Sequence, residues 1–189
     1  MISVSSSLPD QKVFDWLGYS SVGSPRHLYA LCPRGPNDRH ELQALRSVAE
    51  RLSTEPEYWS QIIRTAGWRS TLIGGTCVLI ARPDDRFEDL LYRFERGSFV
   101  SPQLSIAIGM VYPNFAVDSL NSFLDNVSYE RVGHKEIISA QSILRKLGTP
   151  RSNPLKTDSL EPRAHHDAEF VEQLIEKQWA FWTRYHHEK

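Results

Sequence analysis

Residues 68–81 read WRSTLIGGTCVLIA, a run in which apolar side chains occupy most positions and no charged residue follows Arg69. An amphipathic helix repeats its apolar residues at every third or fourth position, so this nearly continuous run predicts an element buried on all sides. Gly74-Gly75 lies in its middle and Pro83 closes it. Each helical glycine costs roughly 1 kcal/mol, but glycines are tolerated where buried helices approach closely. We therefore interpret residues 68–81 as a buried helix.

The same residues leave a second interpretation open. Residues 76–81 and 104–111 are short, apolar and contain β-branched side chains, so both could be strands of a small parallel sheet in an α/β fold. Periodicity alone does not separate a short buried strand from a buried helix. The all-α fold is preferred, because residues 68–81 run on without a turn signal before Gly74.

Helical patterns lie on both sides of this segment. Asp38 and Glu41 form a capping box that opens an apolar-periodic stretch to Leu52, and Thr54 and Glu57 form a second capping box. Further helical segments are expected at 87–94, 104–111, 114–124 and 135–147. The pattern therefore predicts a series of short helices that pack as antiparallel pairs.

Two breaks in the pattern divide the chain. The many glycines and prolines of residues 18–37 predict a loop-rich N-terminal part, and the prolines of residues 149–166 predict a surface linker. We expect one helical domain at residues 1–148, the linker at 149–166 and a C-terminal helix at 167–189.

The C-terminal helix has an aromatic face. Phe170, Leu174, Phe181 and Tyr185 fall on one line of this helix. Such a face must be covered, so we expect it to pack either on the domain or on a second chain, as in a homodimer.

Two successive buried helices open in a similar way, one at residues 68–69 (WR) and the next at residues 101–103 (SPQ). Antiparallel helix pairs of about 30 to 35 residues that cover one another resemble HEAT or armadillo-like helical repeats, here over about residues 38–147. The resemblance implies a short α-α superhelix that binds proteins, and occasionally nucleic acid, on a curved face. Some very short bacterial members resemble toxin-neutralising immunity proteins.

The composition disfavours several function classes. The 189 residues include 22 Lys and Arg and 23 Asp and Glu, for a formal net charge of -1. Proteins that mainly neutralise phosphates are strongly basic, so nucleic acid is not favoured as a partner. Cys32 and Cys77 are too few for a disulfide framework or a thiolate zinc site and are typical of a reduced cytoplasmic protein. We expect neither an export signal nor a membrane-spanning segment.

Recognised catalytic motifs are missing. There is no G-x-x-x-x-G-K phosphate loop and no G-x-S-x-G nucleophile motif. His165-His166-Asp167 is similar to the His-Asp signature of helical metal-dependent phosphohydrolases, but the additional ligands of that pattern are missing, so Asp167 is interpreted as a helix cap. The acids of residues 84–89 are interpreted as a solvated helix start. We therefore expect no cofactor and no metal.

Arg69 and Gln103 open successive buried helices, and the repeat interpretation places them along one edge. We predict that Arg69, Gln103 and Trp68 form a binding rim for a protein partner, because Trp and Arg dominate interface hot spots. The resulting hypothesis is a non-enzymatic interaction module, such as a small bacterial immunity or adaptor protein. A nucleic-acid-binding helical repeat is one alternative. The other is an enzyme whose site forms only in three dimensions, from His27, His40, Glu41 and Asp84.

Overall fold

The structure, a computed structural model, describes residues 39–64, 67–127, 133–150 and 162–188, which form eight helices and no strand. The helices are α3 (Arg39–Thr54), α4 (Tyr58–Arg64), α5 (Trp68–Ala81), α6 (Phe87–Glu95), α7 (Ser101–Val111), α8 (Pro113–Asn126), α9 (His134–Lys146) and α10 (Pro162–His187). Residues 76–81 and 104–111 lie within α5 and α7. The all-α prediction is therefore confirmed, and the alternative with a parallel sheet is wrong.

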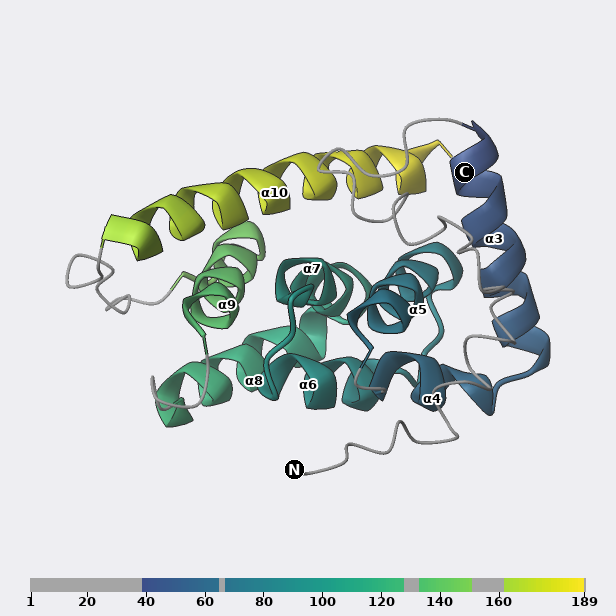
Figure 1. Cartoon of the computed structure of the whole chain (residues 1–189), viewed down its shortest axis with the longest axis horizontal. Helices are drawn as coiled ribbons and strands as arrows, with labels where there is room; N and C mark the ends of the chain where they lie inside the picture. The colour runs from purple at the N-terminus through teal and green to yellow at the C-terminus, as the bar shows by residue number, and fades with distance from the viewer. Residues whose placement is uncertain (1–38, 65–66, 128–132, 151–161, 189) are drawn as a thin grey trace, which may run out of the picture.

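The helices pack in three layers (Figure 1). α4, α6 and α8 form one outer layer, α5, α7 and α9 form the middle layer, α10 runs along the other side of the middle layer, and α3 stands at the end of the stack beside α5. The middle helices are enclosed, as their apolar sequences require. Every residue from 70 to 80 in α5 and from 101 to 109 in α7 is buried.

Each middle helix follows an outer helix, which gives the hairpins α4–α5, α6–α7 and α8–α9. The middle helices begin at residues 68, 101 and 134, a constant step of 33 residues. None of the described helices combines the length and the apolar character that crossing a membrane requires.

Glycines set the spacing between neighbouring helices, both between layers and within the middle layer. A Cβ atom on Gly74 would lie 2.8 Å from Ile63 Cγ1 of α4, and one on Gly109 would lie 2.4 Å from Ile143 Cγ2 of α9. Both separations are far below van der Waals contact, so only glycine permits these helices to approach so closely. The prediction that the Gly74-Gly75 pair marks a close approach of buried helices is confirmed.

The C-terminal helix packs on its own chain. α10 crosses α9 and α7, and its C-terminal end reaches α3, where Arg46 Nε donates a hydrogen bond to Tyr185 Oη at 3.1 Å (Figure 1). The helix begins at Pro162, so the predicted linker at 149–166 extends too far. Leu174 and Tyr185 of the predicted aromatic line are buried, whereas Phe170 is 54% exposed and does not belong to the buried face. Val171, Ile175 and Trp182 complete that face.

One predicted helix start is also wrong. Thr54 is the last residue of α3 rather than a cap of α4, and its hydroxyl donates a hydrogen bond to the carbonyl of Arg51 at 2.9 Å. The helix α4 begins at Tyr58. A Ser or Thr hydroxyl can bond back to the preceding helical turn, so the spacing of Thr54 and Glu57 did not specify a capping box.

We expect Gly109→Ala to lower the free energy of unfolding by about 1–3 kcal/mol, because the new methyl group would overlap Ile143 in a packed core. Gly75→Ala is the matched control. Its Cβ would meet only the tip of the Leu104 side chain, at 3.1 Å, and the higher helix propensity of alanine offsets that contact. Urea unfolding of the two variants measures both effects. Equal stabilities would contradict the close approach of α7 and α9.

Candidate functional site

The first residues of the three middle helices α5, α7 and α9 lie at one edge of the molecule, which we call the turn edge. The preceding outer helices α4, α6 and α8 end at Arg64, Glu95 and Asn126. Contacts between side chains join neighbouring turns: the Trp68 ring lies 5.6 Å from the Phe99 ring, and Glu136 accepts a hydrogen bond from the Ser98 amide. The turn edge thus combines residues that lie far apart in the chain.

Four side chains form a continuous row on the turn edge, in the order Arg69, Trp68, Phe99 and Lys135. The Arg69 guanidinium carbon lies 4.5 Å from the Trp68 ring centre, and Lys135 Nζ lies 5.1 Å from the Phe99 ring centre. The two rings contact each other between these cations. We call this group the Phe99 row. Phe99 is 64% exposed, which is the largest exposure among the large hydrophobic side chains of the described residues.

A buried carboxylate fixes the turn that carries Phe99. Glu136, at the start of α9, is only 4% exposed and accepts hydrogen bonds from the Ser98 amide at 3.0 Å and the Ser101 hydroxyl at 2.5 Å. The Ser98 amide also donates to Ser101 Oγ at 3.0 Å. Hydrogen bonds to a charged acceptor are stronger than neutral ones, so the turn between α6 and α7 is held in one conformation.

A cation supports the same turn from α6. Arg93 Nη1 donates a hydrogen bond to the Gly97 carbonyl at 3.1 Å. Burial lowers the pKa of Arg93, and the nearby charge of Glu136 acts in the opposite direction. Arg93 and Glu136 therefore bracket residues 97–101 with opposite charges, and the backbone before and after Phe99 is tied to two different helices.

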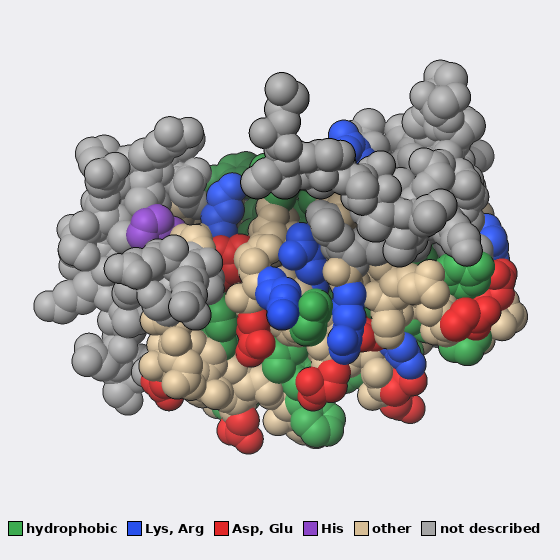
Figure 2. All heavy atoms as spheres, turned by 60° about the horizontal axis from the view of Figure 1, so that its bottom comes forward, with side chains coloured by type: hydrophobic (Ala, Val, Ile, Leu, Met, Phe, Trp, Pro, Cys, Tyr) green, Lys and Arg blue, Asp and Glu red, His purple; other side chains and the backbone are tan. Residues whose placement is uncertain are grey.

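The outer face beside the turn edge is rich in cations and aromatic side chains. Figure 2 shows Lys and Arg side chains gathered in the middle of this face, with acidic and hydrophobic side chains between them. Tyr92 of α6 lies between two guanidinium groups, with its ring centre 4.6 Å from Arg64 Cζ and 3.9 Å from Arg96 Cζ. Cations on aromatic faces thus recur near the turn edge, and each exposed contact of this kind contributes about 0.5–1 kcal/mol.

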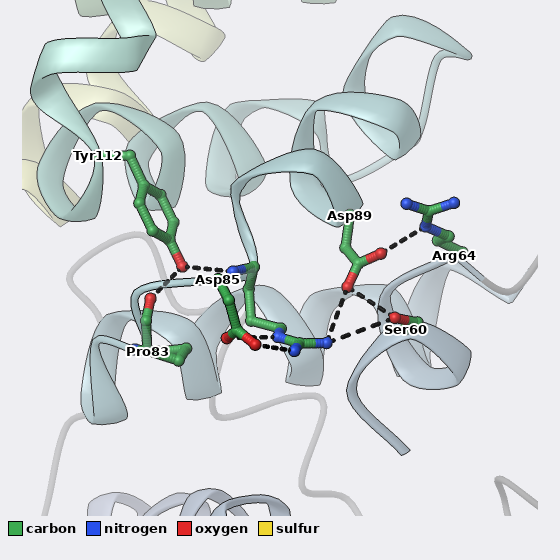
Figure 3. Close-up of polar contacts among 7 residues, drawn as sticks. Ser60, Arg64, Pro83, Asp85, Asp89 and Tyr112 are labelled. Atoms are coloured by element: carbon green, nitrogen blue, oxygen red, sulfur yellow. Dashed lines mark hydrogen bonds and ion pairs between the residues drawn. The ribbon is translucent and has the colours of Figure 1, made fainter. Parts of the chain in front are cut away.

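Figure 3 shows a second polar cluster, at Asp89, between α4 and α6. Asp89 is 4% exposed and accepts hydrogen bonds from Ser60 Oγ at 2.8 Å and Arg64 Nε at 2.5 Å. Arg86 bridges Asp89 and Asp85. The prediction that the acids of residues 84–89 are solvated is therefore wrong for Asp89, which joins two helices. A buried carboxylate with several donors of this kind has a structural role.

Tyr112, the residue that follows α7, also belongs to this cluster. Its hydroxyl donates a hydrogen bond to the Pro83 carbonyl and accepts one from the Arg86 amide at 3.2 Å (Figure 3). Burial raises the pKa of Tyr112 to about 12, the Arg86 amide opposes this shift, and the charge of Asp85 adds to it. The phenol is therefore a neutral structural link between the loops at the edge opposite the turn edge.

The opposite edge is acidic. Phe87 and Phe115 have ring centres 5.4 Å apart, and with Asp84, Asp85 and Glu88 they line a shallow hollow of about 200 Å³. Phe115 is 61% exposed. The two edges of the stack thus both expose a phenylalanine but differ in charge.

The predicted binding rim is only partly an exposed surface. Arg69 is exposed and Trp68 is half-buried, and both belong to the Phe99 row. Gln103 is 6% exposed, so its prediction as a rim residue is wrong. Residue 103 lies two positions into α7, where the enclosed middle layer buries every side of the helix. Its side-chain oxygen has no hydrogen-bond partner among the described residues.

Sequence reasoning missed Phe99, Lys135 and Glu136. Phe99 follows the end of α6 and resembles any other core aromatic in the sequence, while Glu136 looks like an ordinary acid of a first helical turn. The sequence did contain one signal for Phe99: it follows Gly97 and Ser98, which are typical of a turn. Because turns lie on the surface, a phenylalanine at this position is expected to be exposed.

The residues of the enzyme hypothesis do not come together in the part of the chain that the structure describes. His27 and the side chains of His40, Glu41 and His165-His166-Asp167 lie outside the described residues. Asp84 lies on the acidic edge. Among described residues there is no group of three His, Cys, Asp or Glu that could hold a metal ion. Cys77 is a buried free thiol, and Cys32 lies outside the described residues.

Comparisons with protein families, curated proteins and solved structures find no match for this chain.

Removing the charge of Glu136 should loosen the turn that carries Phe99. We expect Glu136→Gln to lower the free energy of unfolding by about 1–3 kcal/mol and to accelerate amide exchange at Ser98, because buried donors lose a charged acceptor. Glu50→Gln, on the exposed face of α3, is the control and should change neither quantity. Hydrogen exchange measured by NMR reports the amide directly. Unchanged exchange at Ser98 would contradict this role for Glu136.

Tyr112→Phe should alter the pH dependence of stability. Between pH 10.0 and about 12 the unfolded chain ionises this tyrosine while the folded chain keeps it protonated. A raised pKa in the folded state therefore stabilises the protein below pH 10, and this contribution is lost as the pH rises towards 12. We expect the wild type to be more stable than the variant at pH 8, and the difference to shrink between pH 10 and 12. Urea unfolding across this range measures it, and a constant difference would contradict the raised pKa.

Proposed function

We propose that the protein is a non-enzymatic interaction module, of the adaptor or immunity type, that docks a protein partner on the Phe99 row. The observation that carries the proposal is the exposed ring of Phe99 on a turn held by Glu136. Aromatic and arginine side chains contribute most of the binding energy of protein interfaces. The row offers two aromatic rings and one arginine within a single set of contacts.

The rigid turn supports the proposal energetically. Ordering a loop or a side chain upon binding costs affinity, and a surface that is already fixed avoids most of that cost. Ser98 and Ser101 bond to Glu136 on either side of Phe99, and Trp68 packs against the Phe99 ring. The ring is thus presented in one orientation before a partner arrives.

The layered arrangement supports docking on an edge. We propose that the three hairpins are HEAT or armadillo-like repeats, since the middle helices recur with a constant step of 33 residues, at 68, 101 and 134. In this chain α10 covers the free side of the middle layer, and α3 covers the end beside α5. A partner therefore cannot reach that side, whereas the turn edge, with the exposed ring of Phe99, stays available.

Location and assembly belong to the same proposal. A buried free thiol at Cys77 fits a reducing compartment such as the cytoplasm. A homodimer through the C-terminal helix stays a prediction. The apolar face of α10 packs within the chain, so such a dimer would use the side that carries Phe170.

Single-stranded nucleic acid is the second candidate, because aromatic rings beside cations also form stacking platforms for bases. The charge balance favours protein. Arg64 pairs with Asp89, Arg86 pairs with two aspartates, and the whole chain carries a net charge of -1. A nucleic-acid surface relies on many unpaired cations, whereas the Phe99 row contains two, Arg69 and Lys135.

The test is site-specific photo-crosslinking in the native host cell, with p-benzoylphenylalanine incorporated in place of Phe99 or, as the control, in place of Phe170. Both positions carry exposed phenylalanines, at 64% and 54% exposure, but only Phe99 belongs to the row. We expect one protein to crosslink from position 99 and not from position 170.

The identified partner then gives a quantitative test. Phe99→Ala should weaken its binding to the purified protein by about 30-fold, the loss of a hot-spot side chain, whereas Phe170→Ala should leave the affinity unchanged. The proposal fails if position 99 yields no protein crosslink, if both positions yield the same products, or if the crosslinked product is nucleic acid.

A further inference from the structure

The Phe99 row carries positive charge without neighbouring carboxylates. Arg69 and Lys135 take part in no ion pair among the described residues, whereas Arg145 and Lys146 at the other end of α9 pair with Glu172 and Glu176. Glu136 is the nearest acid in the sequence to Lys135, and its carboxylate is buried in hydrogen bonds with the turn. Among the described residues, neither cation of the row has an anionic partner.

Stacking on the rings orients these cations for a ligand. A guanidinium that lies over the Trp68 ring keeps the N–H groups on its edge, and these can donate two parallel hydrogen bonds to a carboxylate. The Lys135 ammonium lies over the Phe99 ring and can donate to a second carboxylate. A ligand that covers the apolar ring surface between them displaces water from it, which strengthens both charge interactions.

The spacing of the row fits a short extended segment. The three contact distances allow Arg69 Cζ and Lys135 Nζ to lie at most about 15 Å apart, and alternate residues of an extended strand lie roughly 7 Å apart on one side. Two acids placed two positions before and two positions after an apolar residue span a length within this limit. All three side chains then point in the same direction.

We propose that the Phe99 row binds an extended acidic protein segment in which one apolar side chain lies between two carboxylates, at positions two residues before and after it. The inference rests on the proposed docking function and adds the chemistry of the partner. The apolar side chain packs against Phe99 and Trp68, and the two carboxylates pair with Arg69 and Lys135. Charge at the two ends selects the segment, and the rings supply its apolar contact.

The probe is the peptide Gly-Asp-Ser-Phe-Ser-Asp-Gly with blocked termini. Its binding is measured by NMR, from the shifts of the tryptophan indole N–H signals. The chain contains five tryptophans, and the signal of Trp68 reports on the row. We expect this peptide to shift the Trp68 signal with a dissociation constant in the millimolar range. The same peptide with Asn in place of both Asp, or with Ala in place of Phe, should bind at least about fivefold more weakly.

Charge reversal on the protein gives the matched test. The double variant Arg69→Glu/Lys135→Glu should lose binding of the acidic peptide and gain binding of a peptide with Lys in place of both Asp. The control Lys177→Glu/Arg184→Glu makes the same change in net charge on exposed positions of α10 and should bind like the wild type. The reversed preference distinguishes specific pairing from a general effect of net charge.

Several results would overturn the inference. Equal binding of the Asn peptide, or shifts confined to other tryptophans, would exclude charge recognition at the row. A larger response of Trp68 to a ten-nucleotide oligothymidine than to the acidic peptide would assign the row to nucleic acid. Concentration-dependent shifts without peptide, abolished by Asp84→Lys/Glu88→Lys, would make the acidic edge of a second copy the occupant.

The two experiments fail independently. A protein crosslinked at position 99 whose binding is unaffected by Arg69→Glu/Lys135→Glu would leave the docking function intact and exclude an acidic segment. The absence of any protein crosslink at position 99 would instead remove the docking function itself.

Discussion

Gly74 and Gly109 allow the neighbours of α5 and α7 to approach closer than any side chain would permit, since an added Cβ would meet Ile63 at 2.8 Å and Ile143 at 2.4 Å. This close packing brings the apolar middle helices into contact with partners on every side. Three layers follow from that constraint, because helices without a polar face must be covered on both sides. α4, α6 and α8 lie on one side of the middle layer and α10 on the other, while α3 closes the end beside α5. The remaining surfaces are the outer helices and the two edges of the stack.

The edges also contain the buried polar groups that fix the loops. Glu136 holds the turn between α6 and α7, while Asp89 and Tyr112 connect the starts of α6 and α8 to their neighbours. Burying a charge costs free energy unless donors compensate for it, and each of these carboxylates has several donors. The described backbone around Phe99, Pro83 and Tyr112 is therefore held by several hydrogen bonds, close to the exposed rings of Phe99 and Phe115.

Much of the fold could be predicted from the sequence. The apolar run at 68–81 indicates a helix buried on all sides, and its glycine pair indicates a close approach to a neighbouring helix. The errors have physical reasons. In α7 the apolar residues leave no polar face, so periodicity could not show that Gln103 points into the protein. Asp89 looked like a helix-start acid, because its partners Ser60 and Arg64 come from another helix. Local patterns do not contain such long-range pairs.

Only half of the candidate site could be predicted from the sequence, for the same reason. Trp68 and Arg69 could be identified because they open a helix, whereas Phe99 and Lys135 become their neighbours only when the hairpins stack side by side. An exposed phenylalanine in a turn and a buried carboxylate from another helix that holds this turn both cost folding free energy relative to a polar turn without them. Departures of this kind from what folding alone favours concentrate at functional sites. The cost is best explained if the turn has a second role, which is to hold an apolar ring between two cations where another chain can reach it.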